Sequence, residues 1–321
     1  MEKQRSIPLS AIPFFMIHAA CFLVFLPGIW GTTTTKTIIL AIALFVIRKF
    51  GITGGYHRYF SHRSYKTSRF FQFVLAWLGG SAAQKGALWW AAHHRHHHKY
   101  SDQPEDIHSP ARDGIWWSHV GWVLSPQYNV TQYDQIKDMA KFPELRWLND
   151  YHLVPIFVMG GLCYLIDGWA GVVWGTFVST VVLYHTTFAI NSFCHILGRK
   201  RFPTTDDSKN SLILALVTLG EGWHNNHHFF QGSVNQGFYW WQIDITYYML
   251  RALSWVGVVW DLKKPPQRIL ELGRQKNITE AMVERFTAAS DKLGKTLAKG
   301  PEAVTAIGDM VMRPTSPDPT A

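Results

Sequence analysis

The chain has 321 residues, of which 17% are charged and 15% aromatic, and its formal net charge is +9. Few charges and many aromatic residues are typical of membrane proteins, although the mean hydropathy of -0.03 requires a large polar part as well. The basic residues are scattered beside apolar segments. This excludes a nucleic-acid-binding protein and favours anionic lipid headgroups as partners.

Four apolar segments are long enough, or nearly so, to cross about 30 Å of hydrocarbon. They cover residues 12–30, 37–55, 153–171 and 172–190. A fifth run, 70–83, is too short to span comfortably, so we interpret it as an interfacial or re-entrant helix. We therefore predict an all-α membrane protein with four transmembrane helices in two hairpins. A helical cap, formed by 56–150 and 191–272, completes a membrane domain over residues 1–272.

The basic residues predict the orientation of this domain. The loops near 31–36 and 168–172, at one end of the hairpins, contain a single basic residue, Lys36. The positive-inside rule therefore places both termini and the cap in the cytoplasm. We expect Arg48 and Lys49, in the second span, to extend their side chains to that surface. The polar C-terminal tail, 273–321, is expected to be partly disordered.

Histidines form four groups, and by this topology all of them lie on the cytoplasmic side. The groups are His57 with His62, the run from His93 to His98, Asn191 with His195, and His224 with His227 and His228. Residues i, i+3 and i+4 share one face of a helix. Each HxxHH pattern is therefore expected to aim three imidazoles at one point, and the four groups can converge at one level beside the membrane.

This inventory predicts a site for two metal ions, because about nine imidazoles are too many for one ion. No cysteine joins the groups, which excludes iron–sulfur clusters and thiolate zinc sites, and imidazole suits Zn, Cu, Fe or Ni. Spacing leaves the register of the 93–98 run open, because His93, His96 and His97 also fit HxxHH. A histidine-rich metal transporter is an alternative, but the spans offer few polar residues for a transport path.

The motifs resemble those of the stearoyl-CoA type family of membrane acyl desaturases, and bacterial members most closely. The resemblance runs from about residue 10 to 270. It rests on GITGGYHRYFSHRSYKTS (51–68), HRHHHKYSD (94–102), SHVGW (118–122), NSFCH (191–195), DDSKNS (206–211) and GEGWHNNHH (220–228). It implies a multi-pass protein of a bacterial inner membrane.

The resemblance also implies a di-iron centre with nine histidine ligands and an asparagine that holds a water near one iron. The matching positions are His57, His62, His94, His97, His98, His195, His224, His227 and His228, with Asn191 as the water-mediated partner. The family has an arginine after the first histidine of its second motif, so Arg95 fixes the register on His94.

The implied reaction is O2-dependent conversion of a saturated fatty-acyl chain to a cis-monounsaturated one, at the Δ9 position. Electrons would come from a separate protein of the ferredoxin, rubredoxin or cytochrome b5 type with its reductase, because the chain has no motif for such a group. A membrane hydroxylase of alkanes or sterols, which uses similar histidine motifs, is the alternative enzyme.

In the family a Gln, a Trp and a Thr bend the substrate tunnel, and a second Trp lies beside them. The matching positions are Gln84, Trp90 and Thr187, with Phe188 in place of the second Trp. The animal enzymes also hold coenzyme A with two charged pairs, which Ala92-His93 and Ser125-Pro126 replace here. The acyl carrier is therefore open between phospholipid and a coenzyme A held by other basic residues such as Lys85.

Overall fold

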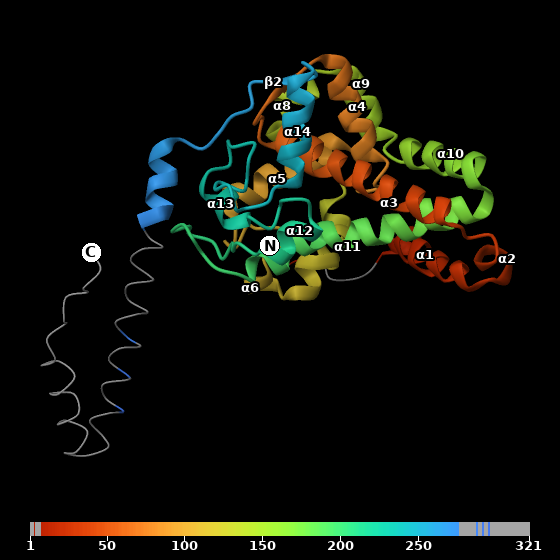
Figure 1. Ribbon diagram of the computed structural model, residues 1–321, viewed down its shortest axis with the longest axis horizontal. Helices are drawn as coiled ribbons and strands as arrows, with labels where there is room; N and C mark the ends of the chain where they lie inside the picture. The colour runs from red at the N-terminus through yellow and green to blue at the C-terminus, as the bar shows by residue number, and fades with distance from the viewer. Residues whose placement is uncertain (1–2, 4–7, 276–286, 288–290, 292–294, 296–321) are drawn as a thin grey trace, which may run out of the picture. The chain divides into compact units, whose positions relative to one another are not determined.

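The computed structural model describes residues 3, 8–275, 287, 291 and 295 (Figure 1). The chain divides into two units, Met1–Leu270 and Glu271–Ala321, and every helix and strand given below belongs to the first. The predicted tail, 273–321, lies almost entirely outside the described residues.

The first unit is mostly helical. Its α-helices are α1 (Ile12–Ala20), α2 (Pro27–Trp30), α3 (Thr35–Phe50), α4 (Arg69–Gly80), α5 (Ala87–Tyr100), α6 (Pro110–Asp113), α7 (Trp122–Leu124), α8 (Lys137–Ala140), α9 (Pro143–Asp150), α10 (Val154–Gly171), α11 (Ser179–Asn191), α12 (Leu212–Val217), α13 (His224–Phe229) and α14 (Ile245–Trp255). Wider π-helical segments cover Gly51–Ser61, Trp117–Gly121 and Val172–Val178, and β1 (Lys66–Thr67) pairs antiparallel with β2 (Val259–Trp260).

The first long helix runs from α3 into the π-helical segment that follows it. Thr34 caps its start through a reciprocal pair of contacts with Thr37. The continuous helix, Thr35–Ser61, has 27 residues and is long and apolar enough to cross a membrane. The sequence predicted this helix only as far as residue 55, so the extension to Ser61 carries His57 into the helix rather than into a loop.

The second long helical region, Val154–His195, has 42 residues and also passes this test. Asp167 and Gly168 interrupt it, and Gly168 has φ 57°, which glycine adopts without steric cost. The chain doubles back there, so that α10 and α11 point in opposite directions (Figure 1). The described residues thus contain two candidate membrane-crossing helices, and the four predicted spans stay a prediction.

Two basic residues of α3 contradict the sequence prediction. Arg48 and Lys49 are 1% and 0% exposed, so neither side chain reaches a surface. Arg48 donates to the Ser81 carbonyl at 3.1 Å and to the hydroxyls of Ser179 and Thr180, and Lys49 donates to Thr187. The reason is that α3 continues into a buried helix, which leaves both side chains facing polar partners on α11.

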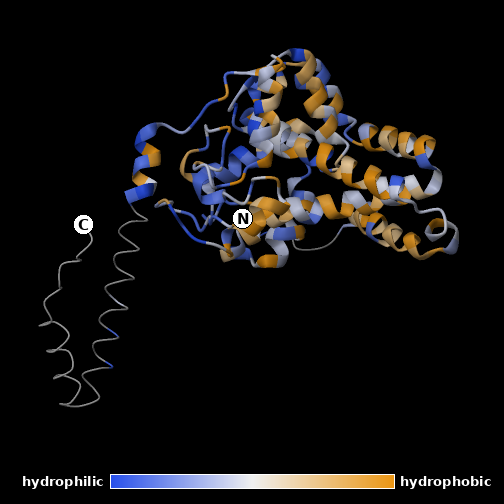
Figure 2. Cartoon of the chain, in the orientation of Figure 1, coloured by the Kyte–Doolittle hydropathy of each residue, from blue (hydrophilic) through white to orange (hydrophobic). Residues whose placement is uncertain are grey.

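Helix α4 packs closely on the π-helical segment and fixes its position. A Cβ on Gly51 would lie 2.6 Å from the backbone of Gly79, and a Cβ on Gly79 would lie 2.2 Å from the ring of Tyr56. Only glycine permits this approach. Figure 2 shows apolar residues along α1, α3, α10 and α11 and hydrophilic residues around α13, so the histidine-bearing end of the unit is its polar end.

Candidate metal centre

The nine predicted histidines converge in two groups. The five-histidine position comprises His57, His62, His94, His98 and His227, and the four-histidine position comprises His97, His195, His224 and His228. Within each group the candidate ligand atoms all lie within 4.8 Å of one another. The division of the histidines between the two positions, which the sequence left open, therefore follows from the geometry.

Helices α5 and α13 each contribute to both positions, which corrects the expectation that an HxxHH pattern aims at one point. His94 and His98, one turn apart on α5, face the five-histidine position, and His97 faces the other. On α13 the assignment is reversed, because His224 and His228 face the four-histidine position. Residues i and i+4 are nearly aligned on a helix, whereas i+3 lies to the other side of that line. The pattern therefore straddles two sites.

The spacing of His57 and His62 fits the π-helix that contains the first of them. In an α-helix of 3.6 residues per turn, residues five apart point in different directions. A π-helical turn closes i→i+5 hydrogen bonds instead, and the His62 amide donates to the His57 carbonyl at 3.2 Å. The two rings lie 4.9 Å apart. The wide turn is thus the local structure that lets HxxxxH supply one site.

The α5 run adopts the arrangement that a register on His94 predicts. His93 and His96 lie outside both groups: His93 bonds the Trp89 carbonyl, and His96 bonds the Glu105 carbonyl at 2.9 Å. Arg95 is not a candidate ligand, and its guanidinium donates to the Phe60 and Ser61 carbonyls at the end of the π-helix. It therefore joins α5 to the segment that carries His57.

Four carboxylates orient the ligands, and sequence reasoning assigned a role to none of them. At the four-histidine position, Nδ1 of three imidazoles contacts a carboxylate. The contacts are His97 with Asp106 at 2.8 Å, His195 with Asp102 at 2.9 Å and His228 with Asp206 at 2.7 Å. At the five-histidine position His57 contacts Glu221 at 2.5 Å, and Glu221 also pairs with Arg58 at 2.9 Å. A carboxylate on Nδ1 leaves the Nε2 lone pair free for a metal and makes it more basic.

Protonation states in the site suit cation binding. Burial, together with neighbouring imidazoles, holds the pKa of His62, His94 and His98 well below its usual range, so these rings are neutral. Burial raises the pKa of Asp106, but the adjoining His97 outweighs it, and the net pKa is below the ordinary value. Burial lowers the pKa of His97, but Asp106 outweighs it and the net pKa is raised, so a metal ion at that ring would displace a proton. Neutral imidazoles backed by ionised carboxylates are the form that coordinates metal ions.

The unpaired nitrogens indicate that a cation fits. Nε2 of His227 lies 3.0 Å from Nε2 of His57 and 3.0 Å from Nε2 of His98, although each neutral imidazole has only one N–H. Nε2 of His228 is buried without a hydrogen-bond partner among the described residues, and so are three Nδ1 atoms in the two groups. Buried polar atoms are rarely left unpaired, and a metal ion would satisfy the converging lone pairs.

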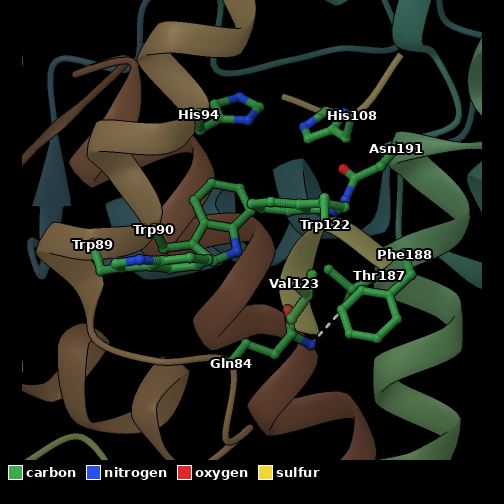
Figure 3. Close-up of a pocket in the computed structure, with 10 residues that line it drawn as sticks. All are labelled: Gln84, Trp89, Trp90, His94, His108, Trp122, Val123, Thr187, Phe188 and Asn191. Carbon is green, nitrogen blue, oxygen red and sulfur yellow. Dashed lines mark hydrogen bonds between the residues drawn. The ribbon is translucent and has the colours of Figure 1, made fainter. Parts of the chain in front are cut away.

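All four predicted tunnel residues line one small cavity of about 30 Å³ beside the histidines (Figure 3). They are Gln84, Trp90, Thr187 and Phe188, and His94 and Asn191 line the same cavity. Thr187 Oγ1 accepts from Gln84 at 3.1 Å and from Lys49 at 3.0 Å, and it donates to the Leu183 carbonyl. This buried network joins α3, α11 and the segment before α5 at one point.

Sequence reasoning gave no role to other residues of this cavity, among them Trp122 and His108. Trp122 belongs to the SHVGW motif and His108 stacks on His97 with ring centroids 4.1 Å apart. A second, apolar cavity of about 770 Å³ shares Gln84, Val123 and Phe188 with the first. The small cavity therefore lies between the histidines and a neighbouring space large enough for an apolar chain.

The fold and the site together define a helical protein with a histidine-rich site able to hold two metal ions beside a large apolar cavity. Residues 33–260 match the model of the fatty acid desaturase family. The chain belongs to this family and is an oxidoreductase.

Individual relatives cover most of the chain. It is 35% identical over 255 residues to an acyl-CoA C20 Delta5-desaturase of Anemone leveillei, which covers 78% of this chain and 80% of that protein. It is 35% identical over 272 residues to an sn-1 stearoyl-lipid 9-desaturase of Synechocystis sp. (83% and 84%). It is 31% identical over 265 residues to an sn-2 palmitoyl-lipid 9-desaturase of Nostoc sp. (81% and 91%).

Proposed function

We propose that this desaturase uses two iron ions and O2 to introduce a cis double bond at Δ9 of a saturated fatty-acyl chain. The observation that carries this proposal is that the two histidine positions lie beside a cavity lined by Gln84 and Thr187, which shares lining residues with the large apolar cavity. Two metal positions and an apolar chain site are the parts that this reaction requires.

The nine histidines would be the protein ligands of the two irons. Asn191 lines the small cavity beside the histidines, at the end of α11. Its proposed role, to hold a water near one iron, rests on this position and on the family resemblance. When bound, the irons would activate O2 and remove hydrogen from the substrate. The reaction balances as R–CH2–CH2–R′ + O2 + 2 e⁻ + 2 H⁺ → R–CH=CH–R′ + 2 H2O.

The chain's own residues would position one methylene pair. Gln84 and Lys49 hold Thr187 from two sides, which fixes the wall of the small cavity. Trp90 stacks on His94 with ring centroids 4.8 Å apart, and both rings line the small cavity. Apolar and aromatic walls exclude water from the reacting carbons, and a rigid bend presents the same pair in each turnover.

The Δ9 position is supported by the bend residues and by two relatives named as 9-desaturases. Another relative is named as a Delta5-desaturase. A bend selects one bond only together with its distance from the carrier end of the chain, so the site that holds the acyl carrier would also determine the position of the double bond.

A membrane location with four spans is supported by exposed apolar side chains. On α10, Phe157 and Leu165 are 75% and 80% exposed, and on α3 Ile39 is 62% exposed. Large apolar surfaces of this kind suit contact with lipid. The reversal at Asp167 would divide Val154–His195 into two spans, and α1 with the residues after it would form a further one. The histidine cap and both termini would face the cytoplasm of a bacterial inner membrane, and residues 1–272 would form the membrane domain.

A phospholipid-bound chain or an acyl-CoA would be the substrate, and the structure supports the lipid. Three of the four positions that carry charged coenzyme A contacts in animal enzymes are buried here, with Ala92, His93 and Ser125 at most 2% exposed, and the fourth, Pro126, is half-buried. Lys85 lines the large cavity but is already bonded to Asn129 and lies over the ring of Trp89. Turnover of phospholipid vesicles faster than of stearoyl-CoA, with the same reductant, would support this choice.

Fatty-acid methyl-ester analysis with double-bond location, in cells that express the chain, tests the proposed function. We expect Δ9-monounsaturated acids with the wild-type chain and none with His228→Ala, alongside about two irons per purified chain. A hydroxylated product would show instead a hydroxylase, and active protein with one ion or with zinc would contradict the di-iron assignment.

A further inference from the structure

One side of the metal centre approaches the surface of the molecule. All four histidines of the four-histidine position are buried, whereas His62 and His98 of the five-histidine position are partly exposed. These two rings line a surface depression of about 410 Å³ together with Arg95, Lys99, Gln231 and Gly232. We call it the basic depression. It is separate from the apolar cavities described above and shares no lining residue with them.

The charges around the basic depression are mostly positive. Arg95 and Lys99 line it, Arg63 follows His62 in sequence, and Lys263 donates to the Arg63 carbonyl at 2.8 Å. Asp138 pairs with Arg95 at 2.8 Å and with Arg63 at 3.6 Å. Four positive charges and one negative charge give this set a net charge of +3.

We propose that the basic depression is the docking site of an acidic one-electron carrier protein, which passes electrons to the centre through the exposed edges of His62 and His98. This inference rests on the proposed function, because that reaction consumes two external electrons. A one-electron carrier would dock twice per turnover and lose one electron each time, while O2 is the final acceptor.

The chemistry of the surface favours this occupant over others. An acyl chain has its own large apolar cavity, whereas none of the residues that line the basic depression has an aliphatic side chain. Positive charge around a partly exposed redox ligand steers a negatively charged partner to that ligand, and such steering raises association rates strongly at low salt. The partner therefore has an acidic surface around its own redox group.

The test uses the iron-loaded full chain, an acidic [2Fe–2S] ferredoxin with its reductase, and the variants Lys99→Glu and Lys263→Glu. At low salt and limiting ferredoxin we expect turnover to fall about fivefold or more for each variant, through a higher KM for ferredoxin, and the difference to shrink at high salt. Arg251→Glu is the matched control. It reverses an exposed charge on α14 that is not among the lining residues, and it should keep wild-type turnover.

A second assay bypasses the carrier. The holoenzyme is reduced with dithionite, freed of reductant, and mixed with substrate and O2 for a single turnover. Wild-type product with unchanged yield in both variants supports docking. A loss of single-turnover product in the variants overturns the docking proposal. An unchanged KM for ferredoxin also overturns it, and so does a loss of binding to anionic vesicles while ferredoxin-driven turnover stays normal. Absence of product in the wild type would instead contradict the proposed function.

Discussion

Replacing Asp106 with asparagine would remove a carboxylate that is bonded on both oxygens. One oxygen contacts Nδ1 of His97 at 2.8 Å, and the other accepts from the Asp102 amide at 2.8 Å. An asparagine side chain has one oxygen, so one of these two N–H donors would face an NH2 group in either orientation. Because Asp106 is 0% exposed, no water would replace the lost contact.

The loss should appear as weaker metal binding at the four-histidine position. Removal of such an outer hydrogen-bond partner typically lowers metal affinity about 10- to 100-fold, which is about 1.4–2.7 kcal/mol. The five-histidine position keeps its own partner, Glu221, and none of its ligands contacts Asp106 directly. We therefore expect the variant to lose about one iron before the wild type loses any.

The assay is iron content per chain after dialysis against increasing chelator, with the helical circular dichroism signal as a check of the fold. Asp138→Asn is the matched control, because Asp138 bonds Arg95 and contacts no histidine of either position. It should retain two irons at every chelator concentration that the wild type tolerates. If Asp106→Asn also retains two, or if it loses both together, the carboxylate does not support one position selectively.

Three further predictions follow from the site and its support. His98→Ala should abolish desaturation and lower iron content, whereas His96→Ala, which loses a bond to a carbonyl, should keep most activity. The reverse order in methyl-ester analysis would contradict the assignment of His94 as the first ligand of this run. Thr187→Trp should fill the small cavity and stop turnover with iron content unchanged, and wild-type turnover would show that Thr187 does not line the substrate path. Gly79→Ala should lower the free energy of unfolding by about 1–3 kcal/mol, because its Cβ would overlap Tyr56. Gly161→Ala, with open space around its Cβ, should be nearly neutral in thermal unfolding, and equal effects of the two variants would refute the close packing of α4.

The histidine spacings indicated a metal site, and the family resemblance supplied the nine ligand positions and the four tunnel positions. The nine histidines and the four cavity residues all fall where the structure forms two groups and a cavity. The carboxylates could not be identified in this way. Asp102, Asp106 and Asp206 lie in loops, where no periodic spacing relates them to the rings they contact.

Two errors came from treating helices as ideal and side chains as independent. The α-helical period suggested that HxxHH serves one point, although two ions a short distance apart can divide the three rings between them. A charge near the end of an apolar segment usually reaches water, but Arg48 and Lys49 meet hydroxyls and a carbonyl from distant parts of the chain. Such long-range partners cannot be seen in a local pattern.

The shared use of α5 and α13 has a consequence for how the centre can assemble and change. Since each helix carries histidines of both positions, neither half of the centre can form while one of these helices is out of place, so uptake of a first ion should order the histidines of the second position. A one-residue insertion inside α5 would turn the following histidines by about 100° and spoil both positions together. Insertions between α5 and α11 that lie beyond Asp102, Asp106 and the residues of the small cavity leave the direction of the histidines unchanged. Length variation should therefore be tolerated between the histidine motifs and rejected within them.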